Sequence, residues 1–200
     1  FARELAKSII ESAQYKVILL DTNPTNIRLA KKQNLNAILC DGMEAEEVYQ
    51  ENQNLFGAGF VIALTDNSEL NQLLMQRWAE NLNQESVYGW IPNEQSTTNR
   101  YRIGQSIFEN LDPPAVLSSE LIKGNYRILN RLINETTDYS FTNAVPLLIL
   151  KDKQVQKINL SEPIEKQVEI GDYLILYQKK LNEEITENKP KDPNQAQLKI

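Results

Sequence analysis

Apolar runs and amphipathic stretches alternate along the first 91 residues of the chain. Short apolar runs rich in branched side chains predict strands, and helical spacing of apolar positions in the intervening stretches predicts helices. The predicted strands are 16–21, 36–41, 59–66 and 86–91. The predicted helices are 1–14, 23–34, 42–55 and 67–84. This alternation indicates an α/β fold with a parallel sheet covered by helices on both faces.

The pattern changes after Pro92, where the regular alternation of strands and helices ends. We expect strands within 104–111, 144–160 and 169–180, whereas 118–135 is compatible with helix or strand. These segments predict a small α+β or mostly β module. The expected division is 1–92 for the α/β domain, 93–102 for a polar connector, 103–181 for the second module and 182–200 for a flexible polar tail.

Polar residues directly follow three of the predicted strands: Asp21, Asp41 and Thr65. Right-handed crossovers place the carboxyl ends of parallel strands at one edge of the sheet. Ligands of open α/β sheets bind at that edge. We therefore expect these three side chains to lie at one binding site.

Helix capping is an alternative role for two strand-end acids. Asp41 precedes Glu44 by three residues, and Asp66 precedes Glu69 by three, which imitates a capping box with Asp in place of Ser or Thr. Such a cap contributes about 1 kcal/mol. Capping and ligand contact are compatible, because the helices begin at the same sheet edge. Both roles therefore remain open for Asp41 and Asp66.

Asp21 differs from the other two acids. The next helix already has Asn23 as an N-cap and Pro24 at its first position, so Asp21 is not needed as a cap. An acid after the second strand of a nucleotide-binding α/β unit accepts hydrogen bonds from ribose hydroxyls and repels a 2′-phosphate. We expect Asp21 to contact a ligand, with a solvated turn residue as the alternative.

Other polar and aromatic residues have simpler interpretations. Cys40 ends an apolar run and is expected to be a small buried hydrophobic residue and not a reactive thiol. Trp78 is expected in core packing or an interface. Asn71 either hydrogen-bonds the backbone near the strand ends or lies on a solvated helix face. Gly171 and Asp172 are expected to form a turn before a strand.

Composition excludes most catalytic machinery. The chain of 200 residues has no histidine and one cysteine, which excludes His-based triads, His metal ligands and disulfides within one chain. No G-x-S-x-G or G-x-x-x-x-G-K-[ST] motif is present. A net charge of −6 argues against nucleic-acid binding. The apolar runs are too short to span a bilayer, and a sequence beginning at Phe1 is expected to be a piece of a longer protein.

Taken together, the strand ends "LLDTN", "LCDGM" and "ALTDNSELN" resemble the RCK/KTN family, the TrkA-N-like regulator-of-potassium-conductance domains. That family has an acid after the second strand, a G-D-type pair with small residues after the third and T-x-x-x-x-x-N after the fourth. Here Thr65 precedes Asn71 by six residues. The resemblance covers residues 1 to about 91, and "AVPLLIL" and "EIGDYLILY" resemble the end of the family's C-terminal subdomain.

The resemblance implies a cytosolic regulator that gates a potassium channel, a potassium uptake system or a cation:proton antiporter. Such domains dimerise and bind NAD, NADH or an adenine nucleotide (AMP, ADP or ATP) without catalysis. The implied site consists of Asp21, Thr22, Asn23, Cys40, Asp41, Gly42, Thr65 and Asp66. Within it, Asp21 would hold the ribose, and Thr65 would lie near the phosphates. Asp41 and Gly42 would border the adenine.

One departure from the family pattern concerns its beginning. The Rossmann-like sheet of the family starts with an apolar strand and a G-x-G-x-x-G loop, and neither is present in this sequence. That strand lies between the family's second and fourth strands, so its omission would leave a hole in the sheet. We expect residues upstream of Phe1 to supply the missing strand, and another segment that fills the gap is the alternative. Residues 1–6, "FARELA", resemble the start of the helix that follows such a loop.

A methyltransferase that uses S-adenosylmethionine is the main alternative, because those enzymes also place acids after the second and third strands. Such an enzyme requires a seven-stranded sheet, which the second half does not obviously continue. A dehydrogenase is a third possibility, but the sequence lacks an evident acid/base pair for a substrate.

Overall fold

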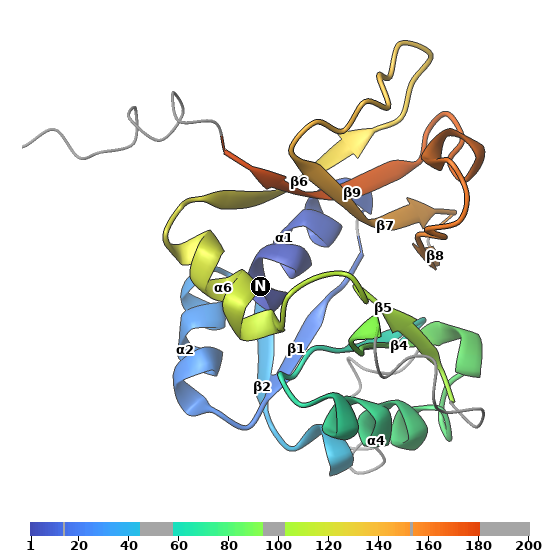
Figure 1. The fold of residues 1–200 in the computed structure, drawn as a ribbon. Coiled ribbons are helices and arrows are strands. Elements are labelled where there is room, and N and C mark those ends of the chain that lie inside the picture. Colours follow the sequence, from blue (N-terminus) through green and yellow to red (C-terminus); the bar gives the residue numbers. More distant parts are fainter. Residues whose placement is uncertain (14, 45–57, 94–102, 153, 181–200) are drawn as a thin grey trace, which may run out of the picture.

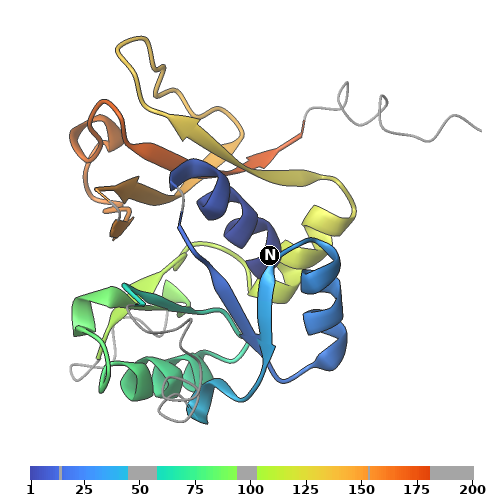
Figure 2. The same ribbon diagram turned by 180° about the vertical axis from the view of Figure 1, so that it is seen from behind.

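The computed structural model describes residues 1–13, 15–44, 58–93, 103–152 and 154–180. An α/β first half with parallel strands is followed by a mostly β second half, as the sequence predicts, and the sheet of this second half is antiparallel (Figures 1 and 2). The elements of the first half are α1 (Ala2–Ala13), β1 (Ile18–Asp21), α2 (Pro24–Lys32), β2 (Asn36–Leu39), η1 (Gly42–Glu44), β3 (Val61–Ala63), α4 (Ser68–Trp78), η3 (Gln84–Ser86), β4 (Val87–Trp90) and β5 (Gln105–Ile107). Those of the second half are α6 (Pro114–Ile122), β6 (Tyr126–Leu132), β7 (Ala144–Lys151), β8 (Gln154–Lys157), η4 (Ile164–Lys166) and β9 (Tyr173–Lys179).

The parallel strands form two hydrogen-bonded groups. β1 pairs with β2, and β3, β4 and β5 form the second group in that order. Among the described residues, no strand pairs with the edge of β1 that faces away from β2. The edge of β3 that faces away from β4 is likewise unpaired there. Ile18 and Leu20 nevertheless pack against the buried cluster that contains Ala63 of β3, so the two groups are neighbours. The interruption lies where omission of the family's first strand would leave a hole in the sheet.

The strand β5 extends the parallel sheet past the boundary that we expected at residue 92. Residues 104–111 were assigned to the second module, but β5 pairs parallel with β4 of the first half. The hydrophobic pattern did not reveal β5 as part of the parallel sheet, because only Ile107 of this short strand is both apolar and buried. Gly104 leads into β5 with φ +82°, and a Cβ there would lie 2.7 Å from the carbonyl oxygen of Val87.

The helices α1, α2 and α4 agree with the sequence pattern in position and differ in length. The helix predicted for 67–84 ends at Trp78, and the N–H of Leu82 donates to the carbonyl of Trp78 in the turn that follows. Leu82 still packs against the cluster around Trp78, which explains why the amphipathic pattern continues. The helix predicted for 42–55 is described only over η1, and the rest of that segment, most of the connector and the tail lie outside the described residues. Among the described helices, none has the length and apolar character needed to cross a membrane.

The second half contains a four-stranded antiparallel sheet in the order β6-β9-β7-β8. The ambiguous segment 118–135 contains both kinds of element, because Gly124, with φ +77°, separates α6 from β6. Gly171, with φ +99°, lies in the turn before β9. The carboxylate of Asp172 accepts a hydrogen bond from the N–H of Glu169 at 2.7 Å, which confirms the predicted turn.

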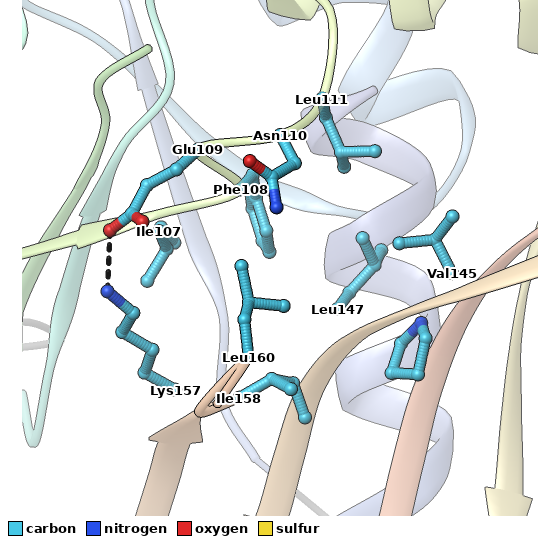
Figure 3. Close-up of a pocket in the computed structure, with 11 residues that line it drawn as sticks. Ile107, Phe108, Glu109, Asn110, Leu111, Val145, Leu147, Lys157, Ile158 and Leu160 are labelled. Carbon is cyan, nitrogen blue, oxygen red and sulfur yellow. Dashed lines mark hydrogen bonds and ion pairs between the residues drawn. The ribbon is translucent and has the colours of Figure 1, made fainter. Parts of the chain in front are cut away.

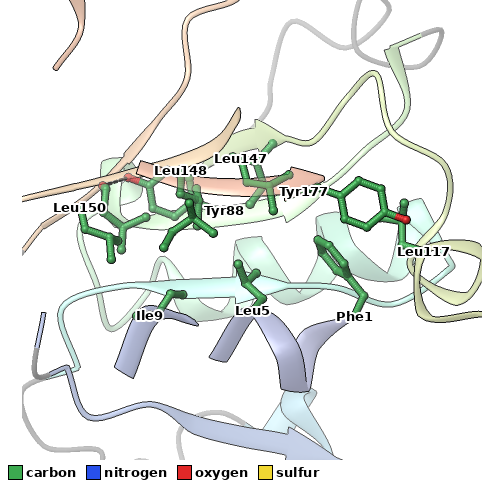
Figure 4. Packing of buried hydrophobic residues seen from close by; sticks show 12 residues of the cluster. Phe1, Leu5, Ile9, Tyr88, Leu117, Leu147, Leu148, Leu150 and Tyr177 are labelled. Carbon is green, nitrogen blue, oxygen red and sulfur yellow. Dashed lines mark hydrogen bonds between the residues drawn. The ribbon is translucent and has the colours of Figure 1, made fainter. Parts of the chain in front are cut away.

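The two halves share one hydrophobic core, with α1 between them (Figure 4). Leu5 and Ile9 of α1, and Phe1 directly before it, contact the antiparallel sheet. There they pack with Leu148 and Tyr177. Another part of α1 packs against α2 and the strands β1 and β2 in a second buried cluster. The amphipathic helix predicted at the N-terminus therefore connects both sheets.

The phenol of Tyr177 supplies a pH-dependent test of this core. Burial is the largest of the effects that raise the pKa of Tyr177 from 10.0 to about 12. The negative charges of Tyr126, Glu120 and Asp112 contribute the rest. The unfolded chain loses this proton first, so the stability contributed by the neutral phenol falls as pH rises from about 10 to about 12. In a spectrophotometric titration, Tyr177→Phe should remove absorbance at the alkaline end of the tyrosine curve. If Tyr177→Phe instead removed absorbance near pH 10, the raised pKa of Tyr177 would be contradicted.

Candidate functional site

The carboxylate of Asp21 is held in place at the end of β1. Its Oδ1 accepts a hydrogen bond from the N–H of Asn23 at 2.7 Å, and its Oδ2 accepts one from the side-chain amide of Asn26 at 2.8 Å. Asn23 is the N-cap of α2, as predicted, and accepts from the N–H of Thr25 at 2.9 Å. Asn23 and not Asp21 therefore caps α2, as predicted, and Asp21 orders the turn before that helix. Each carboxylate oxygen has two lone pairs, so Asp21 retains capacity to accept further hydrogen bonds.

The end of β2 carries Cys40 and Asp41. Burial raises the pKa of the half-buried Cys40 thiol, and the charges of Asp41 and Glu44 raise it further, which favours the neutral thiol over the thiolate. The N–H of Cys40 donates to the carbonyl of Asp21 at 3.2 Å and links the two strand ends. The carboxylate of Asp41 accepts from the N–H of Met43 at 2.9 Å and so caps the first turn of η1, as the capping alternative predicted.

Gly42 lies against α4. Its carbonyl oxygen accepts a hydrogen bond from the indole N–H of Trp78 at 3.0 Å. A Cβ at Gly42 would lie 2.9 Å from the Cδ2 of Leu74, so the close approach of the turn to the helix favours glycine. Trp78 is 2% exposed, as its predicted packing role requires. The indole thus links the end of β2 to α4.

Asn71 joins the ends of β3 and β4. This side chain is fully buried, and its oxygen accepts from the N–H of Thr65 at 2.9 Å and from the Thr65 hydroxyl at 2.8 Å. Its NH₂ group donates to the carbonyls of Thr65 and Trp90, each at 2.9 Å. Of the two roles left open by the sequence, hydrogen bonding to the backbone near the strand ends is correct. The spacing between Thr65 and Asn71 in the family pattern therefore has a structural basis.

Asp66 caps a different helix from the one expected. Asn67 is the N-cap of α4, and its side chain accepts from the N–H of Leu70 at 3.0 Å. The capping box proposed between Asp66 and Glu69 is therefore not formed. Instead, Oδ1 of Asp66 accepts from the N–H of Ala115 in the first turn of α6, at 2.6 Å. Sequence spacing does not reveal a cap from a residue 49 positions away.

These contacts form a connected set of strand ends. The bond from Cys40 to Asp21 links β1 with β2, and the indole of Trp78 links the end of β2 with α4. Asn71 of α4 then links the ends of β3 and β4. Thr22 is exposed on the turn after β1. Sequence reasoning missed Asn26, whose only signal was a polar residue in the first turn of α2, and it missed Ala115 altogether.

A small apolar cavity lies away from this edge, between the loop after β5 and the strands β7 and β8 (Figure 3). Its volume is about 40 Å³, and the ion pair between Lys157 and Glu109, at 2.6 Å, lies beside it. Small-molecule sites typically enclose roughly 300–1,000 Å³. This cavity is too small for a nucleotide, so the strand-end residues remain the better candidate site.

Removal of the Asn71 side chain should destabilise the candidate site and the fold together. Asn71→Ala leaves the N–H of Thr65 and the carbonyl of Trp90 without this partner, so we expect a loss of about 3 kcal/mol in the free energy of unfolding. Urea denaturation followed by circular dichroism measures this loss. Gln76→Ala, at an exposed position of the same helix, is the control and should change stability by about 0.5 kcal/mol or less. Equal effects of the two variants would contradict the role of Asn71.

Comparisons with known proteins place the chain in a family. A search of curated proteins finds no significant match. A solved structure described as the crystal structure of the GsuK RCK domain is similar, with 13% sequence identity and a TM-score of 0.26, over 85% of this chain and 45% of that chain. The present chain therefore spans less than half of that chain's length. The family model of the TrkA-N domain matches residues 1–110, which include all five parallel strands. The chain therefore belongs to the TrkA-N family of RCK domains.

Proposed function

We propose that the strand-end residues bind NAD(H) or an adenine nucleotide and that this binding regulates an attached monovalent-cation transporter or channel. Membership of the TrkA-N family, whose domains are regulatory, supports a role in potassium transport. The single observation that carries the proposal is the set of hydrogen bonds that fixes Asp21, Asp41 and Thr65 at the carboxyl ends of β1, β2 and β3. Polar groups held in this way need little reordering when a ligand arrives.

Asp21 is the proposed ribose contact. The N–H of Asn23 and the amide of Asn26 fix the orientation of its carboxylate while leaving lone pairs free for the two ribose hydroxyls. Hydrogen bonds to a charged acceptor contribute roughly 1.5–3 kcal/mol each. The negative charge also disfavours a 2′-phosphate, so NADH is preferred over NADPH.

The other strand ends complete the proposed site. Asp41 and Gly42 border the adenine, and the neutral thiol of Cys40 adds an uncharged, half-buried surface beside them. Thr22 and Asn23 follow Asp21 in the turn after β1, and Asp66 follows Thr65 in the turn after β3. Thr65 is proposed near the phosphates. No G-x-G-x-x-G loop occurs in the sequence, so the pyrophosphate contacts that such a loop would make are not assigned.

Regulation requires a partner and two states of the domain. We propose a homodimer on the cytoplasmic side of the membrane, attached to the transporter or channel that it gates. A ligand shifts the equilibrium between two arrangements of the dimer only if its affinity for the two differs. Several groups needed for catalysis are missing from the whole sequence, which has no histidine and one cysteine, and this supports a regulatory role without chemistry.

The methyltransferase alternative finds no support. Such an enzyme would continue its parallel sheet to seven strands, whereas β6, β7, β8 and β9 of the described chain form a separate antiparallel sheet. The family match also assigns the first 110 residues to a different kind of domain.

Substitution of Asp21 tests the proposed site while preserving its turn. In Asp21→Asn, the side-chain oxygen still accepts from the N–H of Asn23, and a flipped Asn26 amide can pair with the new NH₂ group. We expect NADH to bind about tenfold more weakly, because bonds to a neutral acceptor are weaker, and the preference over NADPH to narrow. Isothermal titration calorimetry measures both effects.

Asp138→Asn is the matched control for this experiment. The carboxylate of Asp138 accepts from the N–H and hydroxyl of Ser140, at 2.8 and 2.6 Å, in a comparable turn between β6 and β7. This variant should bind NADH like the unchanged chain. If Asp21→Asn also retained full affinity, Asp21 would be removed from the site, and if no adenine nucleotide bound, the proposed function would fail.

A further inference from the structure

The hydrogen bond between Asp66 and Ala115 joins the candidate site to the helix that leads into the second half. Asp66 follows Thr65 at the carboxyl end of β3, and its Oδ1 lies 2.6 Å from the backbone nitrogen of Ala115. The two residues are 49 positions apart, and the bond is exposed to solvent. A contact of this kind can transmit a change at the strand ends to α6.

The first turn of α6 depends on this external acceptor. Pro113 occupies the N-cap position and has no side-chain acceptor, and Pro114 at the first helical position has no N–H. The N–H groups of Val116 and Leu117 donate to the carbonyl of Pro113. The N–H of Ala115 donates to the carboxylate of Asp66. The local sequence of α6 therefore leaves a capping position that Asp66 fills.

Asp66 is held toward α6 by the residues on either side of it. The backbone N–H and hydroxyl of Thr65 bond to Asn71, and the side chain of Asn67 caps α4. The N–H of Asn67 also lies 3.2 Å from the hydroxyl of Thr65. Movement of Thr65 in response to a ligand would therefore change the position of Asp66.

The helix α6 exposes apolar side chains on its outer side, and a short turn connects it to β6. Val116 and Ile122 are 44% and 79% exposed, whereas Leu117 is buried in the shared core. A helix of nine residues has little stability of its own. The turn at Gly124 connects α6 to β6, which forms one edge of the antiparallel sheet. Release of the first turn of α6 would thus alter the connection between the two halves.

We propose that Asp66 couples ligand binding at the strand ends to α6, an inference that rests on the proposed function. A phosphate bound near Thr65 repels the adjacent carboxylate of Asp66, which breaks the bond to Ala115 and frays the first turn of α6. The coupling is reciprocal, so a chain that lacks this bond and this charge binds the nucleotide more tightly. The gain is about fivefold, the factor that corresponds to one typical helix cap.

Two substitutions of Asp66 separate its charge from its hydrogen bond. Asp66→Ala removes both, so without ligand the amides at the start of α6 should exchange about fivefold faster with deuterium. Asp66→Asn removes the charge and keeps an acceptor for Ala115, so exchange should stay close to that of the unchanged chain. Asp138→Ala, which removes an aspartate from the loop between β6 and β7, should leave exchange in α6 unchanged.

The same chains are then measured by hydrogen–deuterium exchange with saturating NADH and, separately, ADP. In the unchanged chain, ligand should increase exchange at the start of α6. In Asp66→Asn, the ligand should bind more tightly than in the unchanged chain and should not increase exchange at the start of α6. In Asp66→Ala, the ligand should bind about fivefold more tightly, and exchange there should not rise above the value measured without ligand.

The possible failures are distinguishable. If Asp66→Ala does not alter exchange in α6 without ligand, the capping role is overturned. If a nucleotide binds but exchange in α6 of the unchanged chain stays constant, the coupling is overturned while the proposed function stands. If neither NADH nor ADP binds, the proposed function fails and the coupling fails with it.

Discussion

The packing of α1 between the two sheets is the constraint on which the rest of the structure depends. Phe1, Leu5 and Ile9 contact the antiparallel sheet, while Ala6 of the same helix belongs to the buried cluster formed with α2 and β2. Burial of each large apolar side chain contributes roughly 1.5–3 kcal/mol. Because α1 packs into both buried clusters, the two halves cannot separate without exposing its apolar side chains to water. Changes at the strand ends are therefore made within a single packed unit.

The acids at the strand ends have structural roles, which the sequence left open beside a contact with ligand. Asp21 fixes the turn before α2, Asp41 caps η1 and Asp66 caps α6, so each acid has a structural function. None of these contacts uses all the lone pairs of the carboxylate. The proposed site would therefore be ordered without ligand, and the proposed effect of a bound phosphate on Asp66 is repulsion of its charge.

The sequence predicted those features that depend on local patterns. Periodicity located α1, α2, α4 and most strands. The spacing of Thr65 and Asn71 identified a pair joined by three hydrogen bonds, and Asn71 donates a fourth to the carbonyl of Trp90. It could not predict β5, because that strand is short and partly polar and its pairing with β4 is a tertiary contact. For the same reason it assigned the wrong helix to Asp66. Long-range contacts have no signature in residue spacing.

The central claim is that an adenine nucleotide binds where the parallel strands end. Two-dimensional ¹H–¹⁵N spectra of the full chain, recorded during titration with NADH, test it most directly. The account predicts that the largest shifts occur at the amides of Thr22, Gly42 and Thr65, on three turns that are separate in sequence and follow β1, β2 and β3. Shifts confined to the cavity around Phe108 and Leu160, or absent altogether, would contradict it.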